Sequence, residues 1–529
     1  MESNRVLINI KRAFDKRNNA IKEINFEELR ERARNIKENS IKNYKELLKI
    51  FIKKMEEKGA KVFLARTPEE VKSVVKGILE KEKSKKIVAS KSMTQEEIGL
   101  KKFLRKKGYE FNETDLGEWI CDLAGSPPKH IVAPAIHFSR FDVKNLFEEK
   151  FNVKLSENIE ELTNFARIRL KRIFEEADTG ILGANFVFAK EGIIGCFENE
   201  GNLGKTFYFP KTCITIFGIE KFVESVKDFP VFLRILPRSA TGQRITSYVH
   251  LLSEKNEGNW YIVILEGKRG EIAMSEEFRE ILYCIRCGAC SNICPVYGVE
   301  EAENYKGPYK GPIGILWNAL LYNFYSNAFY STLCGFCDTV CPVKIKISEK
   351  IKRIRKEKYL PFKIKLFLKI YSILNNYPSL LKTLSEKIPI SIVSQILKNK
   401  EKIHYQYFED FTEEEEKTEH EKNFEKNWKE VKGEFGERGK EFKLEYAISE
   451  TGTCILNSRD FKDFFNEEEV FFRIKREKIL DYFENFFEEK FNFNGNLLFV
   501  SGPSRTADIE KKLILGVHGP WRTFIKIED

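Results

Sequence analysis

Seven of the eleven cysteines fall between Cys284 and Cys341, and their spacing indicates metal chemistry. The first run reads Cys284-Ile-Arg-Cys287-Gly-Ala-Cys290-Ser-Asn-Ile-Cys294-Pro295. This is the C-x₂-C-x₂-C-x₃-C-P spacing of bacterial ferredoxins, in which three thiolates bind one cubane cluster and the fourth binds the other. Zinc is the alternative, but zinc sites usually combine two widely separated C-x₂-C pairs. The run therefore predicts iron-sulfur clusters.

The second run, Cys334-Gly-Phe-Cys337-Asp-Thr-Val-Cys341-Pro342, has Ser331 where the spacing requires a thiolate. If the runs exchange their last ligands, as in ferredoxins, the ligands divide into two sets. Cluster 1 is bound by Cys284, Cys287, Cys290 and Cys341, and cluster 2 by Cys294, Cys334 and Cys337. Three thiolates suit a [3Fe-4S] cluster, or a [4Fe-4S] cluster whose fourth iron binds water, Ser331, or a group of a substrate or partner.

The four other cysteines lie in apolar or strand-like contexts and are expected to be buried as small hydrophobic residues; they are Cys121, Cys196, Cys213 and Cys454. No disulfide framework is indicated, and thiols kept as metal ligands suit a reducing compartment. No apolar signal-peptide core follows the first basic residues, and no apolar run is long enough to span a membrane. We expect a cytoplasmic protein.

A small-anion site is predicted around Pro237-Arg-Ser-Ala-Thr-Gly-Gln243. Hydroxyl groups, a glycine and two guanidinium groups suit a carboxylate or phosphate; the residues concerned are Arg238, Ser239, Thr241, Gly242 and Arg244. The alternative is a capped turn before a helix over 245–252.

Acid-base chemistry has five further candidates, any of which is equally well a structural polar group: Glu113, Asp115, Glu118, His130 and His137. Near residue 94, the sequence is compatible with an anion site at a helix N-terminus or with a capping box formed by Thr94 and Glu97.

The elements around these residues alternate between short apolar runs and helical patterns. Strands are expected over 61–65, 86–89 and 130–133, and helices over 68–81, 96–107 and 141–149. Such alternation predicts an α/β fold with a parallel or mixed sheet. A charged helical pattern over 27–58 precedes it, and four β-rich pieces over 185–266 follow it.

The chain has 529 residues, which predicts several domains. We expect a helical lead-in (1–59), an α/β domain (60–267), a helical two-cluster module (278–346), a basic helical region (347–408), a charged linker or solvated helix (409–440) and a C-terminal segment (441–529). The basic region has the composition of a docking surface for an acidic partner or a membrane, or of an ordinary solvated helix.

The C-terminal segment echoes the latter half of the α/β domain. Three motifs recur in the same order and in the same kinds of element. Ala189-Lys-Glu-Gly192, which a β run follows, matches Ser449-Glu-Thr-Gly452, which a β run also follows. Ile219-Glu-Lys-Phe222 then matches Arg476-Glu-Lys-Ile479, and Pro237-Arg-Ser-Ala-Thr-Gly-Gln243 matches Pro503-Ser-Arg-Thr-Ala-Asp508. We interpret the segment as a partial copy, a second partial α/β unit; similar turn chemistry arising by coincidence is the alternative.

Composition narrows the functional classes. The formal net charge is +10, but charges of both signs are interspersed, so nucleic acid is not an expected partner. Neither a G-x-G-x-x-G motif after a strand nor a Walker motif is present, so nothing in the sequence supports a nucleotide cofactor.

Several motifs together resemble the lactate utilization protein B family. They are Ser90-Lys-Ser-Met-Thr-Gln-Glu-Glu-Ile-Gly99, Glu113-Thr-Asp-Leu-Gly-Glu118, His130-Ile-Val-Ala-Pro-Ala-Ile-His137, Leu236-Pro-Arg-Ser-Ala-Thr-Gly-Gln243 and both cysteine runs. The resemblance covers about residues 20–400. It implies a lactate-utilization domain with a fold related to coenzyme A transferases and sugar-phosphate isomerases. It also implies two [4Fe-4S] clusters, because the family's second cysteine run likewise lacks its first thiolate.

The tail, Val500-Ser-Gly-Pro-Ser-Arg-Thr-Ala-Asp-Ile-Glu510 and Gly516-Val-His-Gly-Pro520, resembles the end of the companion protein C. The front half of protein C has no counterpart here, which leaves a remnant, a fusion or a unit that completes the first domain.

The function that this resemblance implies is electron transfer in a complex that oxidises L-lactate to pyruvate, with a cysteine-rich protein A-like subunit and a protein C-like subunit as partners. Whether this chain itself performs catalysis stays open. The alternatives are an iron-sulfur subunit for another hydroxy acid such as glycolate, a subunit of a heterodisulfide-reductase-like complex, or a redox-sensing ligand-binding protein.

Overall fold

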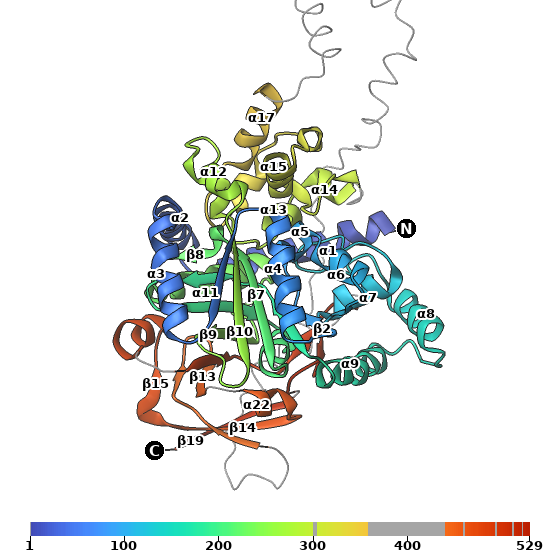
Figure 1. Ribbon diagram of the computed structural model, residues 1–529, viewed down its shortest axis with the longest axis vertical. Coiled ribbons are helices and arrows are strands. Elements are labelled where there is room, and N and C mark those ends of the chain that lie inside the picture. Colours follow the sequence, from blue (N-terminus) through green and yellow to red (C-terminus); the bar gives the residue numbers. More distant parts are fainter. Residues whose placement is uncertain are drawn as a thin grey trace, which may run out of the picture.

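The computed structural model describes residues 2–299, 304–357, 440–458, 461–491, 495–509, 513–520 and 522–528. In Figure 1 the helical cysteine-containing module lies at the top, the α/β domain in the middle and the orange-to-red C-terminal segment at the bottom. Most of the predicted basic helical region and nearly all of the predicted linker lie outside the described residues.

Three helices form the lead-in: α1 (Glu2–Ile21), α2 (Phe26–Lys42) and α3 (Tyr44–Glu57). The side chain of Asn25 caps α2 by accepting a hydrogen bond from the N–H of Glu28. The helical pattern predicted over 27–58 is broken at Asn43, which ends α2 and precedes α3. Helices α1 and α2 pack against α11 (Phe229–Thr241), and α3 packs against the first strand.

The α/β domain is built on a parallel six-stranded sheet. Its strand order is β1 (Lys61–Ala65), β10 (Asn259–Leu265), β7 (Thr212–Gly218), β4 (Thr179–Leu182), β2 (Lys86–Ala89) and β3 (Glu110–Glu113). The central strands are buried on both faces, and they therefore read as continuous apolar runs. The predicted α/β class is confirmed.

Helices cover this sheet on both sides. One core lies between the sheet and α4 (Pro68–Lys81), α5 (Met93–Ile98) and α6 (Leu100–Lys106). A separate core joins α7 (Leu116–Ala124), α8 (Arg140–Phe151) and α9 (Ile159–Glu175), and α10 (Asn202–Tyr208) packs on β4.

Two local predictions are wrong. Residues 130–133 form a loop, because the ring nitrogen Nδ1 of His130 accepts hydrogen bonds from the N–H groups of Val132 and Ala133. The helix predicted over 96–107 is two helices, since Gly99 adopts a left-handed conformation between α5 and α6.

A second sheet joins the α/β domain to the C-terminal segment. Its eight strands run β15 (Ile479–Leu480), β12 (Tyr446–Ile448), β13 (Thr453–Ser458), β16 (Asn496–Val500), β9 (Tyr248–Leu252), β6 (Ile193–Glu198), β5 (Phe186–Phe188) and β8 (Phe222–Val223). The middle contact is antiparallel, with Leu498 opposite His250 and Val500 opposite Tyr248. The segment is therefore continuous with the sheet of the first domain.

The strand pairing of the C-terminal segment repeats that of the first domain, as a partial copy requires. In the first domain β5 pairs with β6 antiparallel and with β8 parallel, and β6 pairs with β9. In the C-terminal segment β12 pairs in the same ways with β13 and β15, and β13 pairs with β16. The short helices η1 (Ile219–Lys221) and η6 (Arg476–Lys478) precede β8 and β15, respectively.

A third sheet extends the copy. Strands β11 (Lys440–Lys443), β14 (Glu469–Lys475) and β19 (Arg522–Glu528) are parallel and repeat the pairing of β4, β7 and β10. The segment also contains α22 (Lys462–Asn466), the π-helix η7 (Asn485–Lys490), and the paired strands β17 (Arg505–Thr506) and β18 (Ile514–Leu515).

The predicted match between residues 237–243 and 503–508 is wrong. Residues 237–241 end helix α11, before β9, whereas Pro503 follows β16. The two proline-containing segments therefore occupy different places in the two copies. The helix predicted over 245–252 is also wrong, since these residues contain strand β9, which pairs with β6 and β16.

The remaining helices are short. Near the first domain they are η2 (Val226–Asp228) and α12 (Lys268–Met274); the cysteine-containing module has η3 (Arg279–Tyr283), α13 (Ala289–Asn292), α14 (Pro295–Val299), α15 (Gly311–Tyr322), η5 (Tyr325–Phe329), α16 (Phe336–Val340) and α17 (Ile347–Glu357).

Candidate functional site

The first cysteine run leaves η3 and winds into α13. Arg286 and Gly288 both have positive φ, 63° and 78°, which turns the chain sharply between successive cysteines. A Cβ atom at Gly288 would lie 2.9 Å from Cγ2 of Ile131. Glycine therefore meets two requirements at this position, a left-handed backbone and close approach to the loop around His130.

Four cysteines line one cavity of about 220 Å³, and they are Cys284, Cys287, Cys290 and Cys341. All four are at most 9% exposed. The opposite wall of the cavity comes from the α/β domain and includes Lys91, Glu118 and His130. The cavity thus lies where the cysteine-containing module meets the first domain.

The other three cysteines of the runs differ in exposure. Cys337 is buried, Cys294 is partly exposed and Cys334 is exposed. The thiols of Cys294 and Cys334 both lie close enough to Cys337 for their charge to disfavour ionisation of the Cys337 thiol. The hydroxyl of Ser331 accepts a hydrogen bond from the N–H of Leu333 at 3.1 Å, so Ser331 belongs to the same turn as Cys334.

The environment of these sulfur atoms fits metal-bound thiolates. Burial raises the pKa of Cys287 to about 12 and that of Cys341 to about 11, so a bound cation is needed to keep these thiols ionised near neutral pH. Backbone N–H groups already point at the sulfurs: Arg286 donates to Cys284 at 3.4 Å, Ile345 to Cys341 at 3.3 Å and Tyr297 to Cys294 at 3.5 Å. Such hydrogen bonds stabilise the sulfurs of iron-sulfur clusters.

Positive side chains surround the inner four cysteines. Arg17 interacts electrostatically with Cys287 and Cys341, and Lys37 with Cys284. The guanidinium of Arg286 lies 4.0 Å from the ring centroid of Trp317 and 3.3 Å from the carboxylate of Glu220. Arg17 favours negative charge at the inner cysteines, whereas the charge of Arg286 is balanced by Glu220 and burial lowers the pKa of Lys37 to about 7.

Family models match the two parts that meet at this cavity. Residues 48–274 match the LUD domain, and residues 280–345 match the 4Fe-4S dicluster domain. The relative named lactate utilization protein B from Bacillus velezensis is 37% identical over 384 residues, covering 70% of this chain and 80% of that protein. The one from Bacillus subtilis (strain 168) is 38% identical, with the same coverage.

The chain belongs to the lactate utilization protein B family. As in the sequence-based prediction, the cofactors are two iron-sulfur clusters. The C-terminal segment follows both matched domains, so it is an addition to the part that the family models describe.

The comparison with solved structures found a DUF162 family protein from Deinococcus radiodurans, which is 12% identical. The match covers 42% of the chain described here and 98% of the Deinococcus protein. Its TM-score of 0.24 is too low to support an argument about the fold. Among the described helices of this family member, none is both long and apolar enough to cross a membrane.

The predicted anion site lies at a helix end. Gly242 is the left-handed C-cap of α11, where the helix dipole is negative. The guanidinium of Arg238 donates to the carbonyls of Ala20, Arg234 and Arg244, and the guanidinium of Arg244 pairs with Glu23. Ser239 is buried, and Thr241 donates to the carbonyl of Pro237. The two guanidinium groups and the hydroxyl of Thr241 are thus occupied within the protein, whereas the hydroxyl of Ser239 has no hydrogen-bond partner among the described residues. The anion site stays a prediction.

The acid-base candidates are separated into different environments. His130 bridges to the cysteine-containing module, because its Nε2 lies 3.0 Å from Oδ1 of Asn292. His137 instead contacts the hydroxyl of Ser126 at 3.1 Å. Glu113 and Glu118 form a buried carboxylate group with Glu96. Near it, Nζ of Lys101 lies 3.1 Å from Glu113, and Nζ of Lys91 lies 4.0 Å from Glu118.

Asp115 belongs to a second carboxylate group that the sequence did not reveal. Its carboxylate lies with those of Glu200 and Asp508, and oxygens of all three are within 4.8 Å of one another. Glu200 precedes α10, and Asp508 follows β17 in the C-terminal segment. The resemblance of residues 500–510 and 516–520 to protein C was the one signal that this part of the tail forms a site.

Proposed function

We propose that this chain is the iron-sulfur electron-transfer subunit of a complex that oxidises L-lactate to pyruvate. The observation that carries the proposal is the cavity in which four buried cysteines face the LUD domain, in a chain of the lactate utilization protein B family. An iron-sulfur cluster accepts and donates one electron at a time. The cavity is lined by these four thiols, by the cations Lys91, Arg286 and Lys310, and by the carboxylates Glu96 and Glu118.

The proposed ligand sets follow the sequence-based assignment. Cys284, Cys287, Cys290 and Cys341 would hold the inner cluster, and their presence around one cavity supports this grouping. Cys294, Cys334 and Cys337 would hold the outer cluster, with a ligand other than cysteine at the fourth iron. Both clusters are proposed to be [4Fe-4S].

The two sets differ in exposure, and this difference supports a direction for electron transfer. The inner set is buried against the LUD domain, whereas Cys334 and the neighbouring Phe336 are exposed, the latter to 53%. We therefore place the contact with a partner subunit at the outer set and the substrate-derived electron at the inner set. The proposed partners are a cysteine-rich protein A-like subunit and a protein C-like subunit, in the cytoplasm.

The test is reduction of the clusters by substrate. The chain, purified anaerobically with its partner subunits, is mixed with L-lactate, D-lactate or glycolate, and bleaching of the visible cluster absorption is followed. We expect L-lactate to bleach the clusters fastest. Equal or faster bleaching by glycolate would assign another hydroxy acid, and no bleaching by any of the three would refute the proposal.

A matched pair of variants controls this experiment. Cys341→Ser removes a proposed inner ligand, whereas Cys213→Ser changes an equally buried cysteine in β7, outside both runs. We expect the first to lose substrate-dependent bleaching and the second to retain it. Loss in both variants would show that the readout reports general unfolding.

A further inference from the structure

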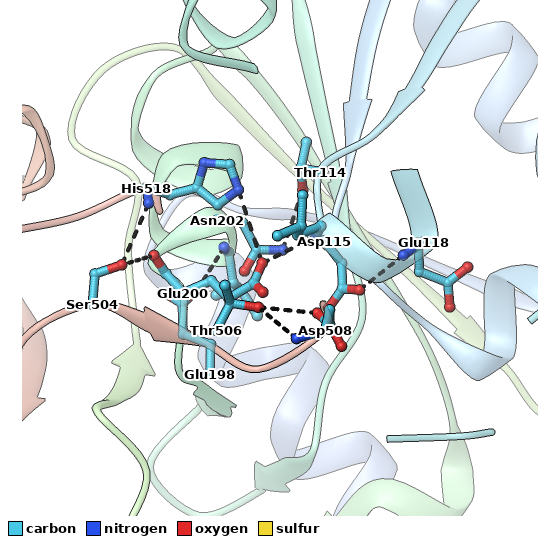
Figure 2. A network of polar contacts seen from close by, with 12 residues as sticks. Thr114, Asp115, Glu118, Glu198, Glu200, Asn202, Ser504, Thr506, Asp508 and His518 are labelled. Atoms are coloured by element: carbon cyan, nitrogen blue, oxygen red, sulfur yellow. Dashed lines mark hydrogen bonds and ion pairs between the residues drawn. The ribbon is translucent and has the colours of Figure 1, made fainter. Parts of the chain in front are cut away.

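The carboxylates of Asp115, Glu200 and Asp508 meet where the C-terminal segment packs on the LUD domain, and we call them the junction carboxylates. Figure 2 shows them together with the ring of His518. Asp115 comes from the N-cap of α7 and Glu200 from the turn before α10, whereas Asp508 and His518 come from the tail. The group therefore exists only when both parts of the chain are in place.

Three acidic groups this close repel one another strongly when all are ionised. Their oxygens lie within 4.8 Å of one another, and like charges at this separation repel strongly where burial limits screening by water. Burial, with Asp115 and Asp508 adding to it, raises the pKa of Glu200 well above its usual range. The contacts of Glu200 with the N–H of Leu116 and the hydroxyl of Thr506 are neutral. A bound cation would remove this repulsion.

His518 provides the independent observation. Its side chain is 1% exposed, and its Nε2 has no hydrogen-bond partner among the described residues but faces Oε2 of Glu200 at 3.8 Å. The ring hydrogen-bonds to the backbone of Thr114, which leaves Nδ1 as the nitrogen engaged there. A histidine that donates Nδ1–H to a backbone carbonyl presents the Nε2 lone pair, as metal-binding histidines do.

The charge state of the ring agrees with this role. Burial, with Lys205 and Arg167 adding to it, lowers the pKa of His518 well below its usual range, so the imidazole is neutral. Two ligand atoms that each lie about 2.1 Å from one ion are at most about 4.2 Å apart. The 3.8 Å between Nε2 and Oε2 of Glu200 falls inside this limit. The three carboxylates are grouped only to within 4.8 Å and without His518, so the four side chains must move closer together to bind one ion.

We propose that Asp115, Glu200, Asp508 and His518 bind one divalent transition-metal cation of the Mn²⁺, Fe²⁺ or Zn²⁺ class, separate from the iron-sulfur clusters. Carboxylate oxygens together with an imidazole nitrogen suit these ions better than Ca²⁺ or Mg²⁺. Two of the carboxylates are already held in position. The hydroxyl of Thr506 bonds to Asp508 at 3.2 Å, and the N–H of Glu118 donates to Asp115 at 3.1 Å.

The other buried carboxylate group, Glu96, Glu113 and Glu118, does not share these properties. Burial and neighbouring carboxylates raise the pKa of Glu113 as well, but Lys101 and Lys91 supply positive charge beside this group. It therefore provides the matched control for a binding experiment.

The experiment titrates Mn²⁺ into the anaerobic holoprotein and follows loss of the six-line signal of free Mn²⁺ by electron paramagnetic resonance. We expect about one Mn²⁺ per chain, displaced by Zn²⁺. Glu200→Gln and Asp508→Asn should each weaken binding at least ~10-fold. Glu113→Gln should bind as the wild type does.

Each outcome decides the proposal. Absence of Mn²⁺ and Zn²⁺ binding in the wild type overturns it, as does binding that survives Glu200→Gln and Asp508→Asn or is lost in Glu113→Gln. Iron content and cluster absorption check that the variants are folded. His518→Gln, which removes the imidazole but no negative charge, should also weaken binding, and unchanged affinity there would exclude the histidine.

Discussion

The carboxylate of Glu97 accepts two hydrogen bonds from the guanidinium of Arg269, at 2.8 and 2.5 Å, with both side chains almost wholly buried. Arg269 also pairs with Glu220 at 2.6 Å. Burial alone would raise the pKa of Glu220, but Arg269 and Arg286 lower this pKa to about 2. The hydroxyl of Tyr309, from the cysteine-containing module, donates to the same Glu97. This network fastens the module to the LUD domain.

Arg269→Leu should therefore destabilise the chain strongly. The substitution leaves Glu97 and Glu220 buried without their shared cation, which typically costs about 3–5 kcal/mol. Chemical denaturation of the holoprotein measures the change. The control is Lys190→Met, which breaks an exposed pair with Glu224 and should leave the free energy of unfolding almost unchanged. Equal effects in the two variants would contradict this account of the network.

Cys334→Ser should remove the outer cluster alone. Cys334 is exposed, so the substitution disturbs little packing. Bound iron should fall from about eight to about four atoms per chain, since each cubane holds about four. Iron analysis after anaerobic purification tests this, and Cys454→Ser, in strand β13, should retain the full content. Full iron in Cys334→Ser would rule out the proposed ligand set.

Glu113→Gln should change how stability depends on pH. Burial, with Glu96 and Asp122 adding to it and Lys101 opposing it, raises the pKa of Glu113 to about 7. Between about pH 4.5 and 7 the folded chain keeps a proton that the unfolded chain has lost. The contribution of Glu113 to stability therefore falls as pH rises, by about 1.4 kcal/mol per unit. It levels off above pH 7.

Denaturation of wild type and variant at pH 5.5 and 7 measures this difference. The free energy of unfolding of the wild type should fall relative to that of Glu113→Gln. Glu110→Gln, on the exposed start of the same strand, should follow the wild type. Parallel behaviour of wild type and Glu113→Gln would show that Glu113 ionises normally.

Phe499→Ala should loosen the join between the two copies. Phe499 lies on β16, is fully buried, and stacks on Phe487 with ring centroids 5.9 Å apart. Its truncation should cost about 3–5 kcal/mol and speed hydrogen exchange in β9, its neighbour in the sheet. Tyr482→Ala, a change at a residue 57% exposed in the same segment, should leave exchange in β9 as it is. Unaltered exchange in Phe499→Ala would show that β9 does not depend on β16.

Local patterns predicted much of this molecule. Cysteine spacing alone grouped Cys341 with the first run, and the structure lines one cavity with those four residues. Apolar runs located β1, β2, β7 and β10 of the parallel sheet, and the signal is continuous in β7 and β10 because both faces are buried. The short strands β3 and β4 were not predicted. Thr94 and Glu97 illustrate a failure: the proposed capping box is absent, since Ser92 is the N-cap and Glu97 pairs with Arg269.

The features that local patterns did not predict depend on contacts between residues far apart in the sequence. Residues 245–252 carry a pattern compatible with a helix, but β9 is fixed as a strand by β6 and by β16, about 250 residues later. Asp115, Glu200 and Asp508 are likewise far apart in the chain and meet through folding. No spacing rule connects them, whereas the proposed iron-sulfur ligands lie in two short runs.

The contact between β9 and β16 has a consequence for assembly. His250 of β9 lies opposite Leu498, its own counterpart in the copy, as at the symmetry axis of an isologous dimer. Here the two halves that pair, the α/β domain and its partial copy, belong to one chain, so their stoichiometry is always one to one. Dilution cannot separate them, because association within one chain depends on an effective concentration set by the intervening residues. Both edges of β9 are therefore paired in every molecule of the protein, by β6 and by β16, and a further subunit must bind elsewhere.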